Sequence, residues 1–270
     1  MINVAVLLTV YNRRVKTLSC LKALFEQVDL PNNVQIKVLL VDDNSQDDTS
    51  AAIAKYYPQV LVLQGGGNLY WSGGMRLAFG EALKEGFDYY LWLNDDTMLY
   101  PTSLAKLLEI SHYLKDQPII AASIKDPERG QLIYGGVKRM HHWRPLKFTL
   151  IPPGEKPIPV ETMNGNCVLI PDSTAQRVGN LDKAFTHGMG DFDYGLRAHK
   201  LGYQVYLAPG YYGECQQNHA IDTHDPFFER WKKLLSPRGL PPREWAVFAR
   251  RYAGPFWPFF WIATYIKRLL

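Results

Sequence analysis

Apolar runs that read as strands alternate with helical segments over the first 122 residues, and this alternation constrains the fold more than any other feature. The first, residues 4–10, is a continuous apolar run rich in β-branched residues, as in strands covered on both faces of a parallel sheet; the others occupy residues 36–41, 60–63, 89–93 and 119–122. Residues 14–28 carry apolar side chains at helical spacing, and further helices are expected from residue 47, near 73–86 and over 101–115. The pattern predicts an α/β fold with a doubly wound, mostly parallel, Rossmann-like sheet.

The alternation breaks down in the middle of the chain and returns later. Residues 124–162 lack clear periodicity, which indicates an irregular insertion or a mixed-sheet extension over the site. Strands are then expected at 166–170 and 205–207, and helices near 172–178 and over 191–200. We therefore assign residues 1–225 to one α/β domain and residues 226–270 to a C-terminal extension of three helical pieces broken by prolines.

Positive charge is concentrated in the C-terminal extension. Residues 1–225 hold 21 Lys and Arg against 24 Asp and Glu, whereas residues 226–270 hold nine against two. A formal net charge of +4 on the whole chain gives no reason to expect a nucleic-acid partner. The extension also carries many aromatic residues, a combination that favours peripheral contact with an anionic bilayer. The alternative is that these aromatic rings pack on the domain or on a partner subunit.

Neither end of the sequence nor its cysteines indicates secretion. The three cysteines are widely spaced and form no CxxC pair, so neither a disulfide framework nor a zinc knuckle is suggested. The first residues lack the pattern of a signal peptide, and the apolar run 255–266 is too short to span a bilayer. We expect a cytoplasmic protein, at the inner face of the cell membrane if the extension binds lipid.

Polar residues follow the predicted strands at the points where ligands bind in open α/β sheets. They are grouped at 9–12, 42–45, 65–74 and 94–96. Any one group could simply cap a helix or form a turn. The adjacent carboxylates Asp95 and Asp96 are more informative, because at a buried strand end they repel each other unless a cation compensates them. Mg²⁺ or Mn²⁺ binds such a pair and leaves positions open for diphosphate oxygens.

Five motifs, in order, resemble the inverting glycosyltransferases of family 2, which have a GT-A fold. The resemblance extends over most of residues 3–215, and its narrower form is with the rhamnosyltransferase-like enzymes of bacterial surface polysaccharide synthesis. The motifs are Leu8-Thr9-Val10-Tyr11-Asn12-Arg13, Val41-Asp42-Asp43-Asn44-Ser45, Gly67-Asn68-Leu69-Tyr70-Trp71-Ser72-Gly73-Gly74, Leu93-Asn94-Asp95-Asp96-Thr97 and Gly190-Asp191-Phe192-Asp193-Tyr194-Gly195-Leu196-Arg197.

The resemblance implies a set of donor-binding residues and a metal ligand. Asp42 would accept a hydrogen bond from the pyrimidine N3–H, Arg76 would pair with phosphate, and Asp96 would be the main metal ligand because Asn94 replaces the usual first Asp. His219 or His224 would be an additional ligand, unless both are exposed loop histidines. The implied donor-binding residues are Thr9, Tyr11, Asn12, Asp42, Asn68, Gly73, Arg76 and Asp95.

Asp191 matches the general base of the family. Its carboxylate would remove the proton of the acceptor hydroxyl in a single displacement that inverts the anomeric carbon. Gly190 stands where a Glu is often found in the family, and Asp191 could instead be a simple helix N-cap.

The activity that the resemblance implies is transfer of a sugar from a UDP- or dTDP-sugar to a hydroxyl of a saccharide or lipid-linked acceptor. Two alternatives remain. A nucleotide-sugar pyrophosphorylase is disfavoured because residues 11–14 do not form the Gly-rich phosphate loop that such enzymes place after the first strand. A non-catalytic sugar-nucleotide-binding protein is suggested by the departures at Asn94 and Gly190.

Overall fold

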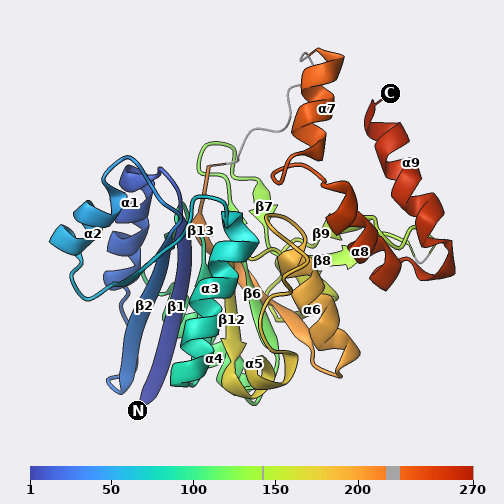
Figure 1. Cartoon of the computed structure of the whole chain (residues 1–270). Helices are drawn as coiled ribbons and strands as arrows, with labels where there is room; N and C mark the ends of the chain where they lie inside the picture. The colour runs from blue at the N-terminus through green and yellow to red at the C-terminus, as the bar shows by residue number, and fades with distance from the viewer. Residues whose placement is uncertain (142, 217–225, 270) are drawn as a thin grey trace.

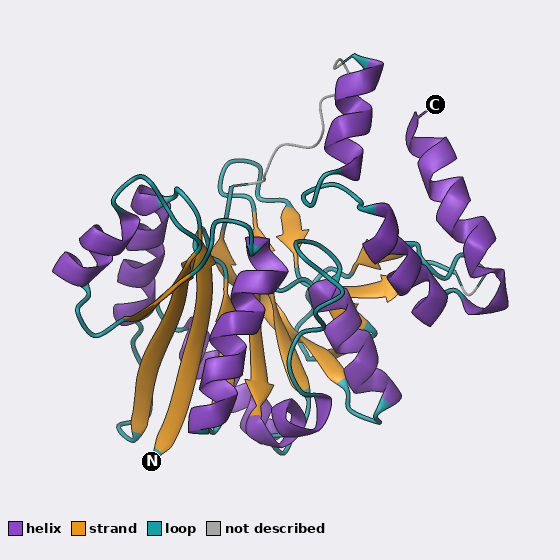
Figure 2. Ribbon diagram, viewed as in Figure 1, coloured by secondary structure: helices purple, strands orange, loops and turns teal. Residues whose placement is uncertain are grey.

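A central ten-stranded sheet with helices on both faces forms the body of the molecule (Figure 1; Figure 2). This computed structural model describes residues 1–141, 143–216 and 226–269, and the counts here refer to those residues. The strands are β1 (Ile2–Val10), β2 (Val34–Asp42), β3 (Leu61–Gln64), β4 (Tyr89–Leu93), β5 (Met98–Leu99), β6 (Ile119–Lys125), β7 (Leu132–Tyr134), β8 (Gly136–Arg139), β9 (Phe148–Leu150), β10 (Ile158–Val160), β11 (Thr162–Met163), β12 (Cys167–Pro171) and β13 (Val205–Glu214). The helices are α1 (Arg14–Phe25), α2 (Thr49–Tyr56), α3 (Tyr70–Glu85), α4 (Ser103–Tyr113), α5 (Asp172–Val178), α6 (Gly190–Lys200), α7 (Phe227–Leu235), α8 (Pro242–Tyr252), the 3₁₀ turn η1 (Gly254–Phe256) and α9 (Trp257–Leu269).

The sheet is mostly parallel, as predicted. Its main strand order is β10-β13-β6-β12-β4-β1-β2-β3. β1 runs parallel to β2 and β4, β2 is parallel to β3, and β13 is parallel to β6. β12 is antiparallel to both of its neighbours, β4 and β6. The start of β12 therefore lies at the same edge as the end of β4.

Each face of the sheet is buried under its own set of helices, which explains the continuous apolar runs. On β1, Val4, Val6 and Leu8 point into a core that also contains side chains of α1, α2 and α4. Ala5 and Leu7 point to the opposite face, where α3, α5 and α6 provide the partners. Alternate residues of one strand thus serve two cores, which is why residues 4–8 of β1 are all apolar and buried.

The segment without periodicity folds as a mixed-sheet extension. β7 pairs with β6 and β10 pairs with β13, both antiparallel, and both extend the central sheet. β8, β9 and β11 form a separate three-stranded antiparallel sheet. These strands are only two to four residues long, which is why no run of alternating residues marks them in the sequence.

Part of the C-terminal extension packs on the body and part faces outward. Trp245, Phe248 and Tyr252 of α8 are buried in a cluster that also contains Phe185 and Leu196. On η1 and α9, Phe256, Phe259, Ile262 and Ile266 are exposed. Three helices were expected from the sequence, and α7, α8 and α9 are found (Figure 1). Among the described residues no helix is long and apolar enough to cross a membrane.

Candidate active site

The Asp95–Asp96 pair lies just beyond β4, buried and in contact with an arginine from the β1–α1 loop. Nη1 of Arg13 is 3.1 Å from Oδ1 of Asp95 and 2.6 Å from Oδ2 of Asp96. The Thr17 hydroxyl donates to Oδ2 of Asp95 at 3.4 Å. Burial raises the pKa of Asp95 to about 7, and the charge of Asp96 adds to the rise while Arg13 opposes it. Positive charge beside Asp95 therefore favours its ionised form.

The carboxylates suit a divalent cation that is completed by substrate oxygens. Oδ1 of Asp96 is buried and has no hydrogen-bond partner among the described residues. A buried carboxylate oxygen without a donor is destabilised, and a cation would relieve it. Within the described ranges no group of three or more His, Cys, Asp or Glu side chains is arranged to hold a metal. Mg²⁺ and Mn²⁺ need fewer protein ligands than this when phosphate oxygens and water fill the remaining positions.

Asn94 has a structural partner, which explains why the motif begins with an amide. Its Oδ1 accepts a hydrogen bond from Nε1 of Trp71 at 2.7 Å, and its backbone N–H donates to the carbonyl of Asn166 at 2.9 Å. Asn94 thus ties the end of β4 to the start of α3 and to the residue before β12. The Asn94 amide oxygen thus serves as a neutral acceptor for the indole N–H of Trp71.

Asp191 lies at the start of α6 and is held from the β11–β12 connection. Its Oδ2 accepts from the backbone N–H of Gly165 at 2.9 Å, and its Oδ1 from that of Phe192 at 2.8 Å. Burial raises the pKa of Asp191 to about 6, although these two N–H groups lower it in part. A carboxyl with this pKa is ionised at neutral pH yet can still accept a proton, as a general base must.

A short chain of contacts joins the two carboxylate sites at one edge of the sheet. Asp191 is bonded to Gly165, and the next residue, Asn166, is bonded to Asn94, which directly precedes Asp95. Gly165 is required at this point, because a Cβ there would lie 2.3 Å from the Trp71 ring. Both carboxylates therefore belong to the rim formed by the end of β4 and the start of β12.

The residue before Asp191 is glycine for a steric reason. A Cβ at Gly190 would lie 2.5 Å from the hydroxyl oxygen of Ser72, which is fully buried in α3. The Ser72 hydroxyl in turn donates to the carbonyl of His187 at 2.9 Å. The close approach of α3 and α6 thus leaves no room for the Glu often found at this position.

The loops after β1 and β2 are linked through several of the predicted donor-binding residues. Asn12 donates its backbone N–H to the Ser45 hydroxyl at 2.9 Å and accepts from the N–H of Gln46 through Oδ1 at 2.7 Å. The buried Asp42 accepts from the N–H of Ser45 at 2.8 Å and from the Ser50 hydroxyl. Tyr11 is exposed beside them. These contacts shape one continuous surface at the ends of β1 and β2.

Asp43, which sequence reasoning did not single out, fixes the start of α3. Its two carboxylate oxygens accept from the backbone N–H groups of Gly67, Leu69 and Tyr70 at 2.7 to 3.1 Å. The negative charge sits where the first N–H groups of a helix lack partners. Its position directly after a strand, before a Gly-rich loop and a helix, was the available signal.

The predicted residues on and before α3 differ in their exposure and in the contacts that they make. Asn68 is exposed in the loop, and Gly74 packs against Thr9, since a Cβ at Gly74 would lie 2.0 Å from the Thr9 hydroxyl oxygen. Gly73 donates its N–H to the carbonyl of Thr186 at 3.3 Å. The Arg76 guanidinium donates to the carbonyls of Asp182 and Phe185 at 3.4 and 3.3 Å, so it contacts the loop before α6. Its pairing with a donor phosphate stays a prediction.

Behind Asp191, the C-terminal extension contributes to an ion-pair network. The fully buried Asp193 accepts from Nε of Arg197 at 2.8 Å and from Nη1 of Arg251 at 2.7 Å. The Tyr252 hydroxyl also donates to Asp193, and Arg251 reaches Asp182 at 2.7 Å. Arg251 and Tyr252 end α8, so the extension stabilises the first turn of the helix that carries Asp191. Nothing in the local sequence of α8 indicated this contact.

His187 lies in the loop directly before α6, the helix that carries Asp191. His187 is partly buried, and its Nδ1 has no hydrogen-bond partner within the described part of the chain. Burial lowers the pKa of His187 to about 4, assisted by the charges of Arg238 and Arg13, so its ring is neutral at pH 7. His219 and His224, the predicted additional metal ligands, lie outside the described residues.

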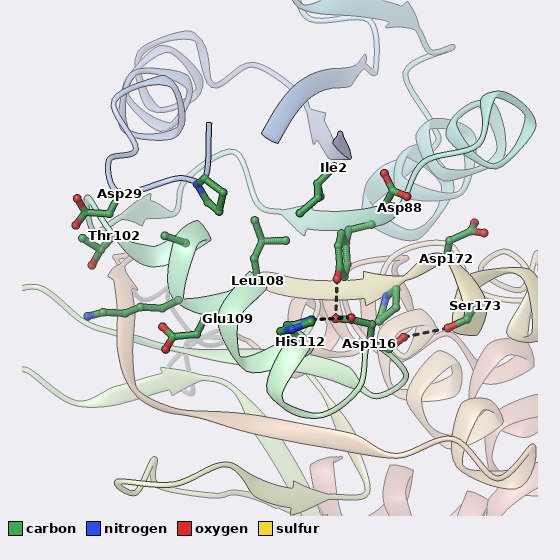
Figure 3. A pocket seen from close by; sticks show the side chains of 15 residues that line it. Ile2, Asp29, Asp88, Thr102, Leu108, Glu109, His112, Asp116, Asp172 and Ser173 are labelled. Atoms are coloured by element: carbon green, nitrogen blue, oxygen red, sulfur yellow. Dashed lines mark hydrogen bonds and ion pairs between the residues drawn. The ribbon is translucent and has the colours of Figure 1, made fainter. Parts of the chain in front are cut away.

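A large groove of about 910 Å³ lies at the other edge of the sheet, where β1 and β4 begin (Figure 3). Ile2 and Tyr89 line it, together with residues of α4. Its charged lining is dominated by carboxylates, which repel a diphosphate. They are Asp29, Asp88, Glu109, Asp116 and Asp172. The groove therefore does not suit a nucleotide sugar, despite its volume.

The fold together with the carboxylate rim defines a glycosyltransferase of the GT-A type. The family model described as "Glycosyl transferase family 2" matches residues 5–176, and the chain belongs to this family. The sequence is 26% identical over 216 residues to an N-acetylglucosaminyl-diphospho-decaprenol L-rhamnosyltransferase of Mycobacterium tuberculosis, covering 70% of this chain and 69% of the relative. The expected resemblance to rhamnosyltransferase-like members of family 2 is confirmed.

Solved structures share the fold at low sequence identity. S. aureus TarS aligns with a TM-score of 0.60 at 13% identity over 92% of this chain, which spans 42% of TarS. TarS 1–349 in complex with UDP aligns at 0.59, over 70% of that chain. The mannosyltransferase PcManGT from Pyrobaculum calidifontis, in complex with GDP-Man and Mn²⁺, aligns at 0.57 with 16% identity, over 95% of this chain and 67% of that one.

Proposed function

We propose that this glycosyltransferase moves a sugar from a UDP- or dTDP-sugar to a hydroxyl of a saccharide carried on a lipid, with inversion at the anomeric carbon and with help from Mn²⁺ or Mg²⁺. The observation that carries the proposal is the juxtaposition of Asp191 with the Asp95–Asp96 pair through Gly165, Asn166 and Asn94. The M. tuberculosis relative is named for a polyprenyl-diphosphate-linked acceptor, and two of the structural neighbours were solved with UDP or with GDP-Man and Mn²⁺.

In this mechanism Asp191 acts as the general base. The acceptor oxygen forms a bond to the anomeric carbon as the bond from that carbon to the diphosphate oxygen breaks. The hydroxyl proton passes to the Asp191 carboxylate, and the nucleoside diphosphate leaves. The two N–H groups that hold Asp191 keep the carboxylate in one orientation, which favours proton transfer along a fixed line.

The leaving diphosphate requires positive charge at the other end of the rim. A divalent cation bound at Asp96, with Asp95 beside it, would supply electrostatic stabilisation of the charge that develops on the leaving group. Asp43 and Asp42 order the loops that would surround the nucleoside, through N–H groups of α3 and of Ser45.

The two alternatives lose support. Family membership argues against a pyrophosphorylase. A non-catalytic protein was suggested by Asn94 and Gly190, but Asn94 bonds to Trp71 and Gly190 avoids Ser72. Both departures thus have packing reasons that leave Asp96 and Asp191 in position.

The proposal is tested by incubating the purified protein with a panel of nucleotide sugars and Mn²⁺ and measuring release of nucleoside diphosphate. We expect slow hydrolysis of one UDP- or dTDP-sugar without acceptor, and faster release with a lipid-linked saccharide. Turnover of none of the panel, together with no thermal stabilisation by any nucleotide, would contradict the proposal.

The pH dependence of transfer should follow the ionisation of Asp191. Its pKa is raised to about 6, and a general base works only when deprotonated, so the rate should rise with pH and level off above about 6. The measurement is the initial rate between pH 4.5 and 8 at saturating metal. A rate that is flat or falls over this range argues against a carboxylate base.

We further propose that the outward face of α9 lies on an anionic membrane and brings the rim to a lipid-linked acceptor. Phe259, Ile262 and Ile266 of α9 recur every three or four residues, so they share one helical face, and all are exposed, as is Phe256 of the preceding 3₁₀ turn η1. Lys267 and Arg268 follow at the end of the helix. This arrangement of apolar and basic residues is typical of helices that lie in a bilayer interface.

Replacing Phe259, Ile262 and Ile266 with serine should release the protein from membranes. Each substitution removes apolar area that would be buried in the interface, so we expect at least a tenfold weaker partition. The measurement is co-sedimentation with vesicles that contain anionic lipid. As a matched control, serine at the exposed Val15 and Tyr113 removes apolar surface elsewhere and should change nothing. Equal losses in both variants, or none in either, would count against this membrane face.

A further inference from the structure

Arg13 holds the position of a counter-ion at the carboxylate pair. One nitrogen, Nη1, contacts both Asp95 and Asp96, at 3.1 and 2.6 Å. The backbone of Arg13 is fixed, because its carbonyl accepts from the N–H and the hydroxyl of Thr17 at 2.9 and 3.0 Å. The side chain, in contrast, is 34% exposed. Rotation about its side-chain bonds would separate the guanidinium from the carboxylates and leave the backbone of α1 in place.

The guanidinium and a divalent cation cannot both bind this pair favourably. Oδ1 of Asp96 is shielded from solvent, and the other oxygen of the same carboxylate, Oδ2, is 2.6 Å from Nη1 of Arg13. Arg13 already lies against the same carboxylate, and its positive charge repels an incoming cation. The ion and the arginine thus compete for one site.

We propose that Arg13 is an internal competitor of the metal that couples metal binding to nucleotide binding. In the nucleotide-free protein it pairs with Asp95 and Asp96 and weakens the binding of a cation. When a diphosphate arrives, Arg13 turns from the carboxylates to the phosphate oxygens, which accept guanidinium hydrogen bonds strongly, and the cation takes its place. The inference rests on the proposed function, because it assigns the diphosphate to this rim.

Coupling of this kind is reciprocal and measurable. If Arg13 makes metal binding depend on nucleotide, nucleotide binding depends on metal by the same factor. Removing Arg13 should raise the affinity for the cation alone and reduce that factor. If Arg13 only contacted the bound nucleotide, its removal would instead weaken nucleotide binding and leave the affinity for the cation alone unchanged.

The test measures Mn²⁺ binding by the electron paramagnetic resonance of the free ion, with and without UDP or dTDP. Arg13→Met removes the charge, and Arg13→Lys keeps one charged nitrogen at the end of the side chain. Arg14→Met is the matched control, since Arg14 is the exposed neighbour. Thermal melts with and without Mn²⁺ provide a second readout that needs no turnover.

For Arg13→Met we expect about tenfold tighter binding of Mn²⁺ alone than in the wild type, and a larger rise in melting temperature on adding Mn²⁺. Arg13→Lys and Arg14→Met should behave as the wild type. If the wild type binds Mn²⁺ with nucleotide but Arg13→Met binds Mn²⁺ alone no more tightly, the competition is overturned and the proposed function stands. If no protein binds Mn²⁺ under any condition, the metal assignment fails as well.

Discussion

Replacing Asp191 with asparagine is expected to lower the rate of glycosyl transfer by roughly 10²- to 10⁴-fold, the range that a general base contributes. An amide cannot accept the hydroxyl proton, yet it fills the same space and can still accept the N–H of Gly165. Binding of the nucleoside diphosphate should change little, because the donor side of the rim is untouched. The measurements are the transfer rate at saturating donor and the calorimetric affinity for UDP or dTDP.

A charge-matched control separates catalysis from a general loss of negative charge. Asp48→Asn removes the charge of an exposed carboxylate directly before α2. The Asp48 side chain makes no capping hydrogen bond to this helix. It should transfer at the wild-type rate. Transfer by Asp191→Asn within a few-fold of this control would show that another group takes the proton.

Replacing Asp96 with asparagine should abolish most of the dependence on metal and lower transfer by about 10²-fold. Cation stabilisation of a leaving group is worth several kcal/mol, and each ~1.4 kcal/mol is a tenfold change in rate. Asp95→Asn should have a smaller effect on metal affinity, because both oxygens of Asp95 already have protein partners, whereas Oδ1 of Asp96 has none in the described ranges.

The comparison of these two variants is made by titrating activity with Mn²⁺. We expect the apparent Mn²⁺ affinity to fall much further in Asp96→Asn than in Asp95→Asn. The reverse order would assign the principal metal contact to Asp95, and unchanged activity without added metal would remove the cation from the mechanism.

The body of the fold was predictable because strands buried on both faces leave continuous apolar runs. β1, β2 and β4 and the helices between them follow this rule, and their boundaries differ from the prediction by only a few residues. The direction of β12 was harder to foresee. It follows the long excursion through β7 to β11 instead of a helical crossover, and nothing in its own five residues distinguishes an antiparallel central strand from a parallel one.

The candidate site was predictable where chemistry follows a strand end directly and less so where it depends on distant contacts. Asp95, Asp96 and Asp191 could be selected from motifs. The positions of Arg13 and Arg251 could not, because long side chains from other segments reach these carboxylates only after the chain has folded. The contacts of Arg76 with two backbone carbonyls of the loop before α6 were likewise not visible in its local sequence.

The C-terminal extension illustrates why composition alone left two interpretations open. Its aromatic residues divide between the two roles: Trp245, Phe248 and Tyr252 are buried against the body, whereas Phe256 and Phe259 face outward. Both kinds of residue look alike in the sequence. They differ only in whether the folded chain turns them toward the body or toward the outside.

The most direct test of the shared rim is the anomalous scattering of crystals grown with Mn²⁺ and UDP or dTDP. The account predicts a manganese peak bonded to Asp96 and to the diphosphate, with the side of the diphosphate that would carry the sugar facing Asp191. A peak remote from Asp96, or a nucleotide bound in the acidic groove where β1 and β4 begin, would contradict it.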